Sequence, residues 1–235
     1  TALFAALAIM ITALPLTIIP ISAAGTDGES TEYSSDGYLI VRNYQQLRLA
    51  YNGSEESKIR LGADIDCDPD EYKPNYLTLD LAGYTLKKTG NSIDSQDHLL
   101  SVQYSKLTIE DSVGTGKMYF YAKDVAQNLL LAENRSTIVI NGGTFCYTGT
   151  NAMYCEMIKL SASDLVINDG YFDAQIGTPI KLDNGFAGGG PGTLNSTALI
   201  NGGTIVTTSS IALSSIDGCA YYASLVMTGG TITNK

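Results

Sequence analysis

A six-residue phrase recurs along this chain at intervals of about thirty residues. It combines an apolar residue, a small polar residue, a glycine step and an apolar or β-branched end. Its copies begin at Leu81, Ile109, Ile140, Ile167, Ile200 and Met227. The steps between these first positions are 28, 31, 27, 33 and 27 residues. A phrase that keeps one period over so many copies is typical of a solenoid, in which each copy belongs to one coil of a stack.

Each copy carries two more short apolar-x-apolar units. One follows the glycines, as in Phe145-Cys146-Tyr147. The other precedes the phrase, and its copies end at Val102, Leu131, Leu160, Leu182 and Leu213. Alternation of apolar and polar residues gives each unit one apolar face, which only stacked coils can bury. A β-sandwich also has short strands but does not require one phrase at a fixed period. The sequence therefore predicts an all-β parallel solenoid with three strands in each coil of about 30 residues.

The two ends of the array differ from its middle. Residues 43–51 have the spacing of an amphipathic helix, which we expect to cap the first open coil. Residues 25–37 are small and acidic, so we interpret them as a flexible linker before a repeat domain at 38–235. Because the last phrase ends three residues before Lys235 without a polar cap, we expect further coils to follow in the natural chain.

The first two dozen residues indicate export. Residues 1–24 carry no charge and contain a continuous apolar stretch, then Pro15, Pro20 and the small residues Ser22-Ala23-Ala24. This order predicts a cleaved signal peptide whose true start precedes Thr1. An uncleaved membrane anchor is the alternative, because 24 uncharged residues can cross a bilayer. Both interpretations predict a secreted or cell-surface protein, with membrane contact only through this segment if it stays uncleaved.

The net charge and the cysteine content limit the kinds of partner and cross-link that the protein can have. The net charge of −10 disfavours nucleic acid, because an acidic surface repels phosphates. Four cysteines in an exported chain permit disulfides, and Cys146 and Cys155 are close enough in sequence to pair. We expect buried thiols instead, and the spacing of Cys67, Cys146, Cys155 and Cys219 matches no CxxC metal pattern.

The N-terminal half resembles a known group of proteins. The segments 44–47, 59–65, 77–86 and 107–117 follow one another as at the start of many bacterial surface β-helix proteins. These belong to the pectate-lyase-like superfamily, and the resemblance covers residues 38–235. It implies a right-handed parallel β-helix with an N-terminal capping helix. It does not imply a function, because the superfamily includes polysaccharide lyases, polygalacturonase-type hydrolases and non-enzymatic adhesin-like proteins.

Catalytic candidates are weak. The chain has none of the Asn-Thr-Asp, Asp-Asp, Gly-His-Gly or Arg-Ile-Lys motifs of the hydrolase members. We expect its one histidine, His98, in an exposed turn, and neither Arg60 nor Arg135 lies in a lyase motif. Asp111 and Asp169 occupy equivalent positions two coils apart, roughly 9.6 Å by strand spacing, near the upper separation of inverting glycosidases. They are also ordinary turn residues, which is the stronger interpretation.

Metal and ligand candidates come from two other patterns. Asp64, Asp66 and Asp68 alternate, so an extended chain would place these possible Ca²⁺ ligands on one face; a solvated acidic loop is the stronger interpretation. Exposed aromatic residues bind sugar rings or partner surfaces, and the ligand-binding candidates on the repeats are Tyr119, Tyr121, Tyr147 and Tyr171. The glycine-rich segment 186–192 adds a projecting loop to one coil.

The sequence thus favours a secreted or cell-surface β-helix with an adhesion, glycan-binding or scaffold role and no cofactor. Its partner would be an extracellular glycan or a protein on a host or cell surface. The alternative is a polysaccharide lyase or glycoside hydrolase with a divergent or missing active site. An enzyme requires converging carboxylates or Ca²⁺ beside a basic residue, whereas a binding protein requires only an exposed aromatic or polar surface.

Overall fold

A computed structural model describes residues 32–52, 57–67, 76–90, 97–124, 126–150, 154–183, 195–208, 212–213 and 223–235. The segment predicted to be a signal peptide, residues 25–31, Asp68 and the glycine-rich segment 186–192 lie outside these ranges. Residues 32–235 form one compact unit. It therefore includes residues 32–37 at the end of the segment interpreted as a linker.

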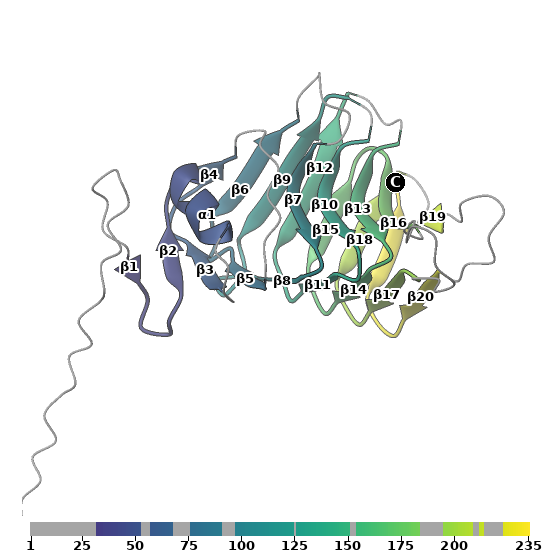
Figure 1. Cartoon of the computed structure of the whole chain (residues 1–235). Helices are drawn as coiled ribbons and strands as arrows, with labels where there is room; N and C mark the ends of the chain where they lie inside the picture. Colours follow the sequence, from purple (N-terminus) through teal and green to yellow (C-terminus); the bar gives the residue numbers. More distant parts are fainter. Residues whose placement is uncertain are drawn as a thin grey trace, which may run out of the picture. The chain divides into compact units, whose positions relative to one another are not determined.

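Strands of the described residues form three sheets (Figure 1). Sheet A has the order β1-β2-β3-β5-β8-β11-β14-β17-β20. Its strands are β1 (Glu32–Tyr33), β2 (Leu39–Val41), β3 (Ser57–Leu61), β5 (Leu77–Asp80), β8 (Lys106–Glu110), β11 (Thr137–Ile140), β14 (Asp164–Ile167), β17 (Thr197–Ile200) and β20 (Ser224–Met227).

The other two sheets repeat the same pattern. Sheet B has the order β21-β18-β15-β12-β9-β6-β4 and sheet C the order β19-β16-β13-β10-β7. Sheet B contains β4 (Ile65–Asp66), β6 (Thr85–Thr89), β9 (Lys117–Ala122), β12 (Thr144–Gly149), β15 (Tyr171–Ala174), β18 (Thr204–Thr207) and β21 (Thr231–Asn234). Sheet C contains β7 (His98–Gln103), β10 (Asn128–Glu133), β13 (Glu156–Ser161), β16 (Thr178–Asp183) and β19 (Ala212–Leu213).

Successive repeats stack in parallel. The chain passes from sheet A to B to C and back to A, and apart from the antiparallel pair β1–β2 the described strand pairs are parallel. The all-β class and the parallel stacking of repeats are confirmed, and this arrangement is consistent with a β-helix. The first positions of the phrase from Ile109 to Met227 pair in register, as predicted.

Two predicted alignments are wrong. Leu79, not Leu81, pairs with Ile109, because β5 ends at Asp80, which is in register with Glu110, and Leu81 already follows the strand. In sheet C, Ala132 and not Leu131 is in register with Val102 and Leu160. Residues 129–131 are all leucine, so apolar and polar residues do not alternate there. The sequence alone therefore did not show which of the three faces inward.

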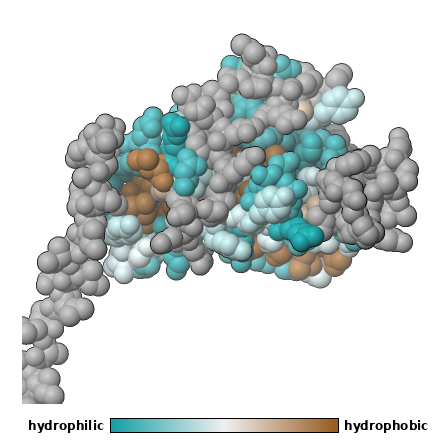
Figure 2. All heavy atoms as spheres, viewed as in Figure 1, coloured by the Kyte–Doolittle hydropathy of each residue, from teal (hydrophilic) through white to brown (hydrophobic). Residues whose placement is uncertain are grey.

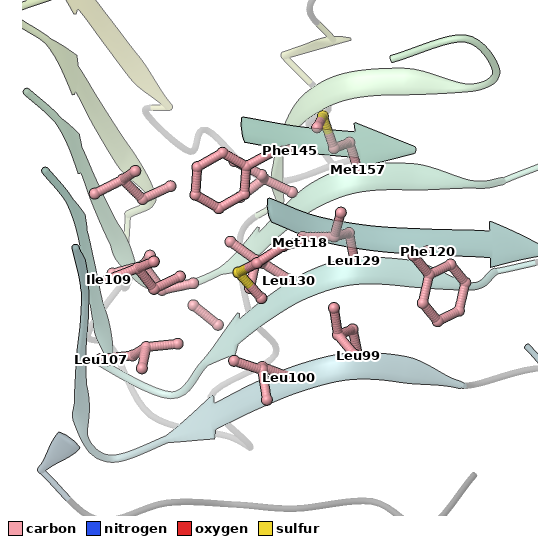
Figure 3. Packing of buried hydrophobic residues seen from close by; sticks show 14 of the residues in the cluster. Leu99, Leu100, Leu107, Ile109, Met118, Phe120, Leu129, Leu130, Phe145 and Met157 are labelled. Atoms are coloured by element: carbon pink, nitrogen blue, oxygen red, sulfur yellow. The ribbon is translucent and has the colours of Figure 1, made fainter. Parts of the chain in front are cut away.

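The interior between the sheets is mostly apolar. Figure 3 shows side chains from all three sheets meeting there, among them Leu107 of sheet A, Phe120 of sheet B and Leu130 of sheet C. Phe145 stacks on Phe172 of the next repeat, with ring centroids 4.7 Å apart. Equivalent positions therefore pack on one another from coil to coil, which is what a repeating inner face requires.

Two of the corners carry ladders of polar side chains. At the A-to-B corner, Asn168 Nδ2 donates to Asn141 Oδ1 (2.8 Å) and Asn201 Nδ2 donates to Asn168 Oδ1 (2.9 Å). At the C-to-A corner, the backbone N–H of one buried serine donates to the hydroxyl of the serine one repeat later. This serine ladder contains Ser105, Ser136, Ser163 and Ser196. Both ladders satisfy polar groups at positions where the sheet hydrogen bonds stop.

A helix lies near the start of the unit. Helix α1 (Tyr44–Tyr51) begins after Asn43, whose side-chain oxygen accepts a hydrogen bond from the backbone N–H of Gln46 (2.9 Å). This is the usual N-cap arrangement. Leu47 and Tyr51 are buried, and the helix contacts β2 and β3. Among the described residues, no helix is long and apolar enough to cross a membrane.

Candidate binding face

The two aspartates considered for catalysis lie in A-to-B corners. Asp111 Oδ1 accepts from the backbone N–H of Gly83 (2.9 Å) and its Oδ2 accepts from that of Gly116 (2.6 Å). Asp169 Oδ1 accepts from the backbone N–H of Gly170 (2.7 Å). Both carboxylates therefore bind corner backbone, which is the turn role that the sequence favoured for them.

The alternating aspartates also have local partners. Asp64 Oδ1 accepts from the backbone N–H of Thr85 (2.7 Å), and Asp66 forms an ion pair with Lys87 (3.2 Å). Asp68 lies outside the described residues. Within the described ranges, no group of three or more His, Cys, Asp and Glu side chains is placed to hold a metal ion.

The predicted tyrosine surface is divided between two faces of sheet B. Tyr119 and Tyr121 lie half-buried on the outer face of β9, and Tyr171 is 42% exposed at the start of β15. The prediction is wrong for Tyr147, which is fully buried in the interior. Its hydroxyl donates to the backbone oxygen of Gln127, and its ring stacks on Phe120.

The structure also places His98 and Arg60. His98 does not lie where the sequence predicted, and Arg60 is held by ion pairs. His98 is not in an exposed turn but is a nearly buried residue at the start of β7. Arg60 pairs with Asp80 (2.7 Å) and with Asp36 (2.8 Å), and its guanidinium lies 4.3 Å from the centre of the Tyr38 ring. These contacts hold a positive charge between two carboxylates, so Arg60 is a structural residue of sheet A.

The charges around Arg60 shift the neighbouring acids and the phenol. Hydrogen bonds from Arg60 and Ser34 lower the pKa of Asp36 to about 2. Burial raises the pKa of Asp80, but hydrogen bonds from Ser112 and Arg60 outweigh it and the pKa is lowered. The hydrogen bond that the Tyr38 hydroxyl donates to Glu110 raises the Tyr38 pKa to about 12. All these groups favour the charge states that hold the network together near neutral pH.

Three described cysteines are thiols. Cys146 and Cys155 are both free and do not pair; Cys67 and Cys146 are half-buried and Cys155 is buried. Burial raises the pKa of the Cys67 thiol to about 12 and also raises that of Cys146. Thiols held in the protonated form are poor nucleophiles.

The outer side of sheet C carries a set of polar side chains that the sequence analysis did not single out. We define the polar face of sheet C as three columns in register across β7, β10, β13 and β16. Its residues are His98, Asn128, Glu156 and Thr178; Ser101, Leu131, Lys159 and Lys181; and Gln103, Glu133, Ser161 and Asp183. The second column lies between inward-facing residues such as Leu100 and Val102, so it points away from the core. Five members of the face are nonetheless buried, and the lysines and the third column are half-buried; the buried members are His98, Ser101, Asn128, Leu131 and Glu156.

Ion pairs connect β13 with β16 on this face, and a hydrogen bond connects β13 with β10. Lys181 Nζ lies 3.0 Å from Glu156 Oε1 and 3.4 Å from Asp183 Oδ2, and Lys159 Nζ lies 3.9 Å from Asp183 Oδ2. Asn128 Nδ2 donates to Glu156 Oε2 (3.0 Å). Burial lowers the pKa of Lys181, but Glu156 and Asp183 outweigh it, so the pKa stands above its usual 10.5. A lysine of raised pKa is a poor general base, and this network is suited to hydrogen bonding.

Two exposed tyrosines stand at opposite edges of the polar face. Tyr104 directly follows β7 and is 71% exposed; Tyr154 lies two residues before β13 and is 69% exposed. Both have positive φ, 54° in each case, a conformation that a bulky residue rarely adopts. The backbone demands it, because Asn134 beside Tyr104 and Ala126 beside Tyr154 also have positive φ. The fold thus requires the conformation but not an aromatic side chain.

The serine ladder and the lysines of the polar face could have been found in the sequence. Each serine of the ladder stands four residues before the first position of a phrase, at 105, 136, 163 and 196. The lysines Lys159 and Lys181 occupy the middle of two equivalent apolar-x-apolar units. Aligning the polar middle positions would have shown Ser101, Lys159 and Lys181 of the second column, but not Leu131. Its ion pairs involve side chains of different columns, which no linear pattern indicates.

Comparisons with known proteins do not identify the chain. No protein-family model, curated protein or solved structure matches it. The site must therefore be interpreted from its own chemistry.

Proposed function

We propose that this chain forms the repeat domain of a secreted or cell-surface right-handed parallel β-helix protein of the pectate-lyase-like superfamily. In this proposal α1 caps the first coil, and the domain binds an extracellular glycan without catalysis. The binding site is the polar face of sheet C with Tyr104 and Tyr154 at its edges.

One observation carries the binding proposal: two tyrosines about 70% exposed border a face of interlinked hydrogen-bonding groups. Aromatic rings combine apolar area with a polar hydroxyl and lose little conformational entropy on contact. A few fixed polar groups then orient the ligand. The six residues of β7 span about 20 Å, enough for an extended ligand of several units.

The proposal that the domain is not catalytic is supported by the hydrogen bonds and ion pairs that already hold the candidate acids and bases. Asp111 binds two corner N–H groups, Lys181 is held charged by Glu156 and Asp183, and Arg60 is fixed between two aspartates. Groups that are held in one charge state by permanent partners serve structure and recognition better than proton transfer. The enzymatic alternative is tested directly by product analysis.

The experiment uses the complete protein and a panel of neutral and acidic polysaccharides, with and without Ca²⁺. Affinity electrophoresis should show retardation by one class. Tyr104→Ala and Tyr154→Ala should each weaken binding about 3- to 10-fold, as expected for loss of one stacking aromatic. Tyr33→Ala is the matched control, because Tyr33 is 58% exposed on β1 of sheet A. Equal binding of all three variants would refute the site, and release of unsaturated or reducing ends would refute the non-catalytic role.

A further inference from the structure

The lysines of the polar face are already neutralised by the protein. Lys181 contacts the carboxylates of Glu156 and Asp183, and Lys159 lies 3.9 Å from Asp183. The side chain of Glu156 is only 4% exposed and those of Lys181 and Asp183 are 20% and 17% exposed. These pairs are therefore only partly screened by water, and each partner depends on the other for its charge compensation.

The sum of charges on this face is negative. Its two lysines stand against Glu133, Glu156 and Asp183, which leaves one net negative charge with His98 neutral. The whole chain also carries −10. Carboxylate or sulfate groups of an acidic ligand would meet repulsion of about 1–4 kcal/mol per close pair, depending on the local dielectric constant.

An anionic ligand would also have to take a lysine from its present partner. Moving Lys181 toward a ligand carboxylate would leave Glu156 nearly buried and uncompensated, which is the arrangement that makes broken buried pairs unfavourable. Hydroxyl groups impose no such exchange. Each hydroxyl donates one hydrogen bond and accepts others, so it can join carboxylate, amide and ammonium groups without separating them.

We infer that the ligand of the polar face is an uncharged, hydroxyl-rich chain, a neutral polysaccharide in preference to a uronate or sulfated one. This inference rests on the proposed function and adds its ligand class. It depends on the ion pairs of Lys159 and Lys181, whereas the binding site itself depends on Tyr104 and Tyr154.

The test compares one neutral polysaccharide and polygalacturonate of similar length against the complete protein. The wild type should bind the neutral chain with an affinity that changes less than about twofold between 0.05 and 0.5 M NaCl, because no charges are paired across the contact. It should bind polygalacturonate at least about tenfold more weakly.

A variant that removes the carboxylates beside the lysines should bind the acidic polysaccharide better. Glu156→Gln with Asp183→Asn keeps the shapes of both side chains but frees Lys159 and Lys181, so it should gain at least about tenfold in polygalacturonate binding at low salt and lose the gain at 0.5 M NaCl. Asp183→Asn alone serves if the double variant does not fold. Asp169→Asn is the matched control for Asp183→Asn, since each removes one negative charge and Asp169 lies at an exposed A-to-B corner.

The outcomes separate the two proposals. Tight wild-type binding of polygalacturonate that Tyr104→Ala weakens would overturn the neutral-ligand inference and leave the binding function standing. Neutral binding that neither tyrosine variant weakens, or no binding to either polysaccharide, would overturn the proposed function. A charge variant that binds polygalacturonate no better than Asp169→Asn would show that the lysines do not set the ligand class.

Discussion

Lys88 and Asp97 form an ion pair in the interior between the sheets, and separating it should destabilise the fold strongly. The two side chains are 1% and 2% exposed, and Lys88 Nζ also donates to the backbone oxygen of His98 (2.7 Å). In sheet B, Lys88 is in register with Phe120, which is in register with Tyr147. The lysine thus occupies a position that aromatic side chains hold in the next two repeats.

The expected magnitude follows from this burial. Asp97→Ala leaves the Lys88 ammonium group without its carboxylate in an apolar interior, which costs about 3–5 kcal/mol. For a domain of this size that corresponds to a fall in Tm of roughly 6–20 °C. Lys88→Met leaves the Asp97 carboxylate in the same condition and should cost a similar amount. The double variant removes both charges, so it should be more stable than either single variant.

Thermal and urea unfolding followed by circular dichroism at pH 7 measure these differences. Lys106→Met is the control, because Lys106 is exposed at the start of β8 and should change stability by less than about 0.5 kcal/mol. A cost below about 1 kcal/mol for each single variant would refute this role of the ion pair. Costs that add in the double variant would refute it too, because a true pair must show coupling.

Three further predictions address the corners and the N-terminal network. Ser136→Ala should cost about 1–3 kcal/mol in urea unfolding, because its hydroxyl joins two backbone groups of the buried serine ladder. Gly203→Ala should be severely destabilising, since φ is +84° and the new Cβ would lie 2.7 Å from a backbone oxygen, whereas Gly142→Ala, with 3.9 Å of space, should be tolerated. Arg60→Met should reduce the acid sensitivity of Tm between pH 4 and 2. The folded pKa of Asp36, about 2, lies below its usual 3.8, so this stabilisation is complete above pH 4 and is lost as pH falls toward 2.

The repeat was the part of the fold that could be predicted from sequence, because backbone geometry forces it. Each phrase must supply an inward residue such as Ile140 and a corner that permits positive φ, as at Gly143. Those requirements recur in every repeat, so the residues that meet them recur in the sequence at a regular interval. The one-sided alternation of Leu165 and Ile167 around Val166 is of the same kind.

The burial of Tyr147 could have been predicted, because Tyr147 alternates with Phe145 across Cys146, which is in register with the outward-facing Tyr119. What could not be predicted depends on contacts between different sheets. Lys88 follows the alternation as an inward residue, and only its pairing with Asp97 from the start of sheet C makes that position acceptable. Such compensation comes from a neighbour in space and has no local sequence signal.

The serine ladder has a consequence for how this protein can be altered. Ser136 Oγ donates to the backbone oxygen of Glu133, three positions earlier, whereas Ser196 Oγ donates to that of Asp183, thirteen positions earlier. The same serine-to-backbone hydrogen bond therefore closes a tight corner in one repeat and spans a long insertion in another. A peptide epitope or a small domain grafted between Asp183 and Ser196 should thus leave the stacking of the coils unchanged, which makes this corner a natural site for display.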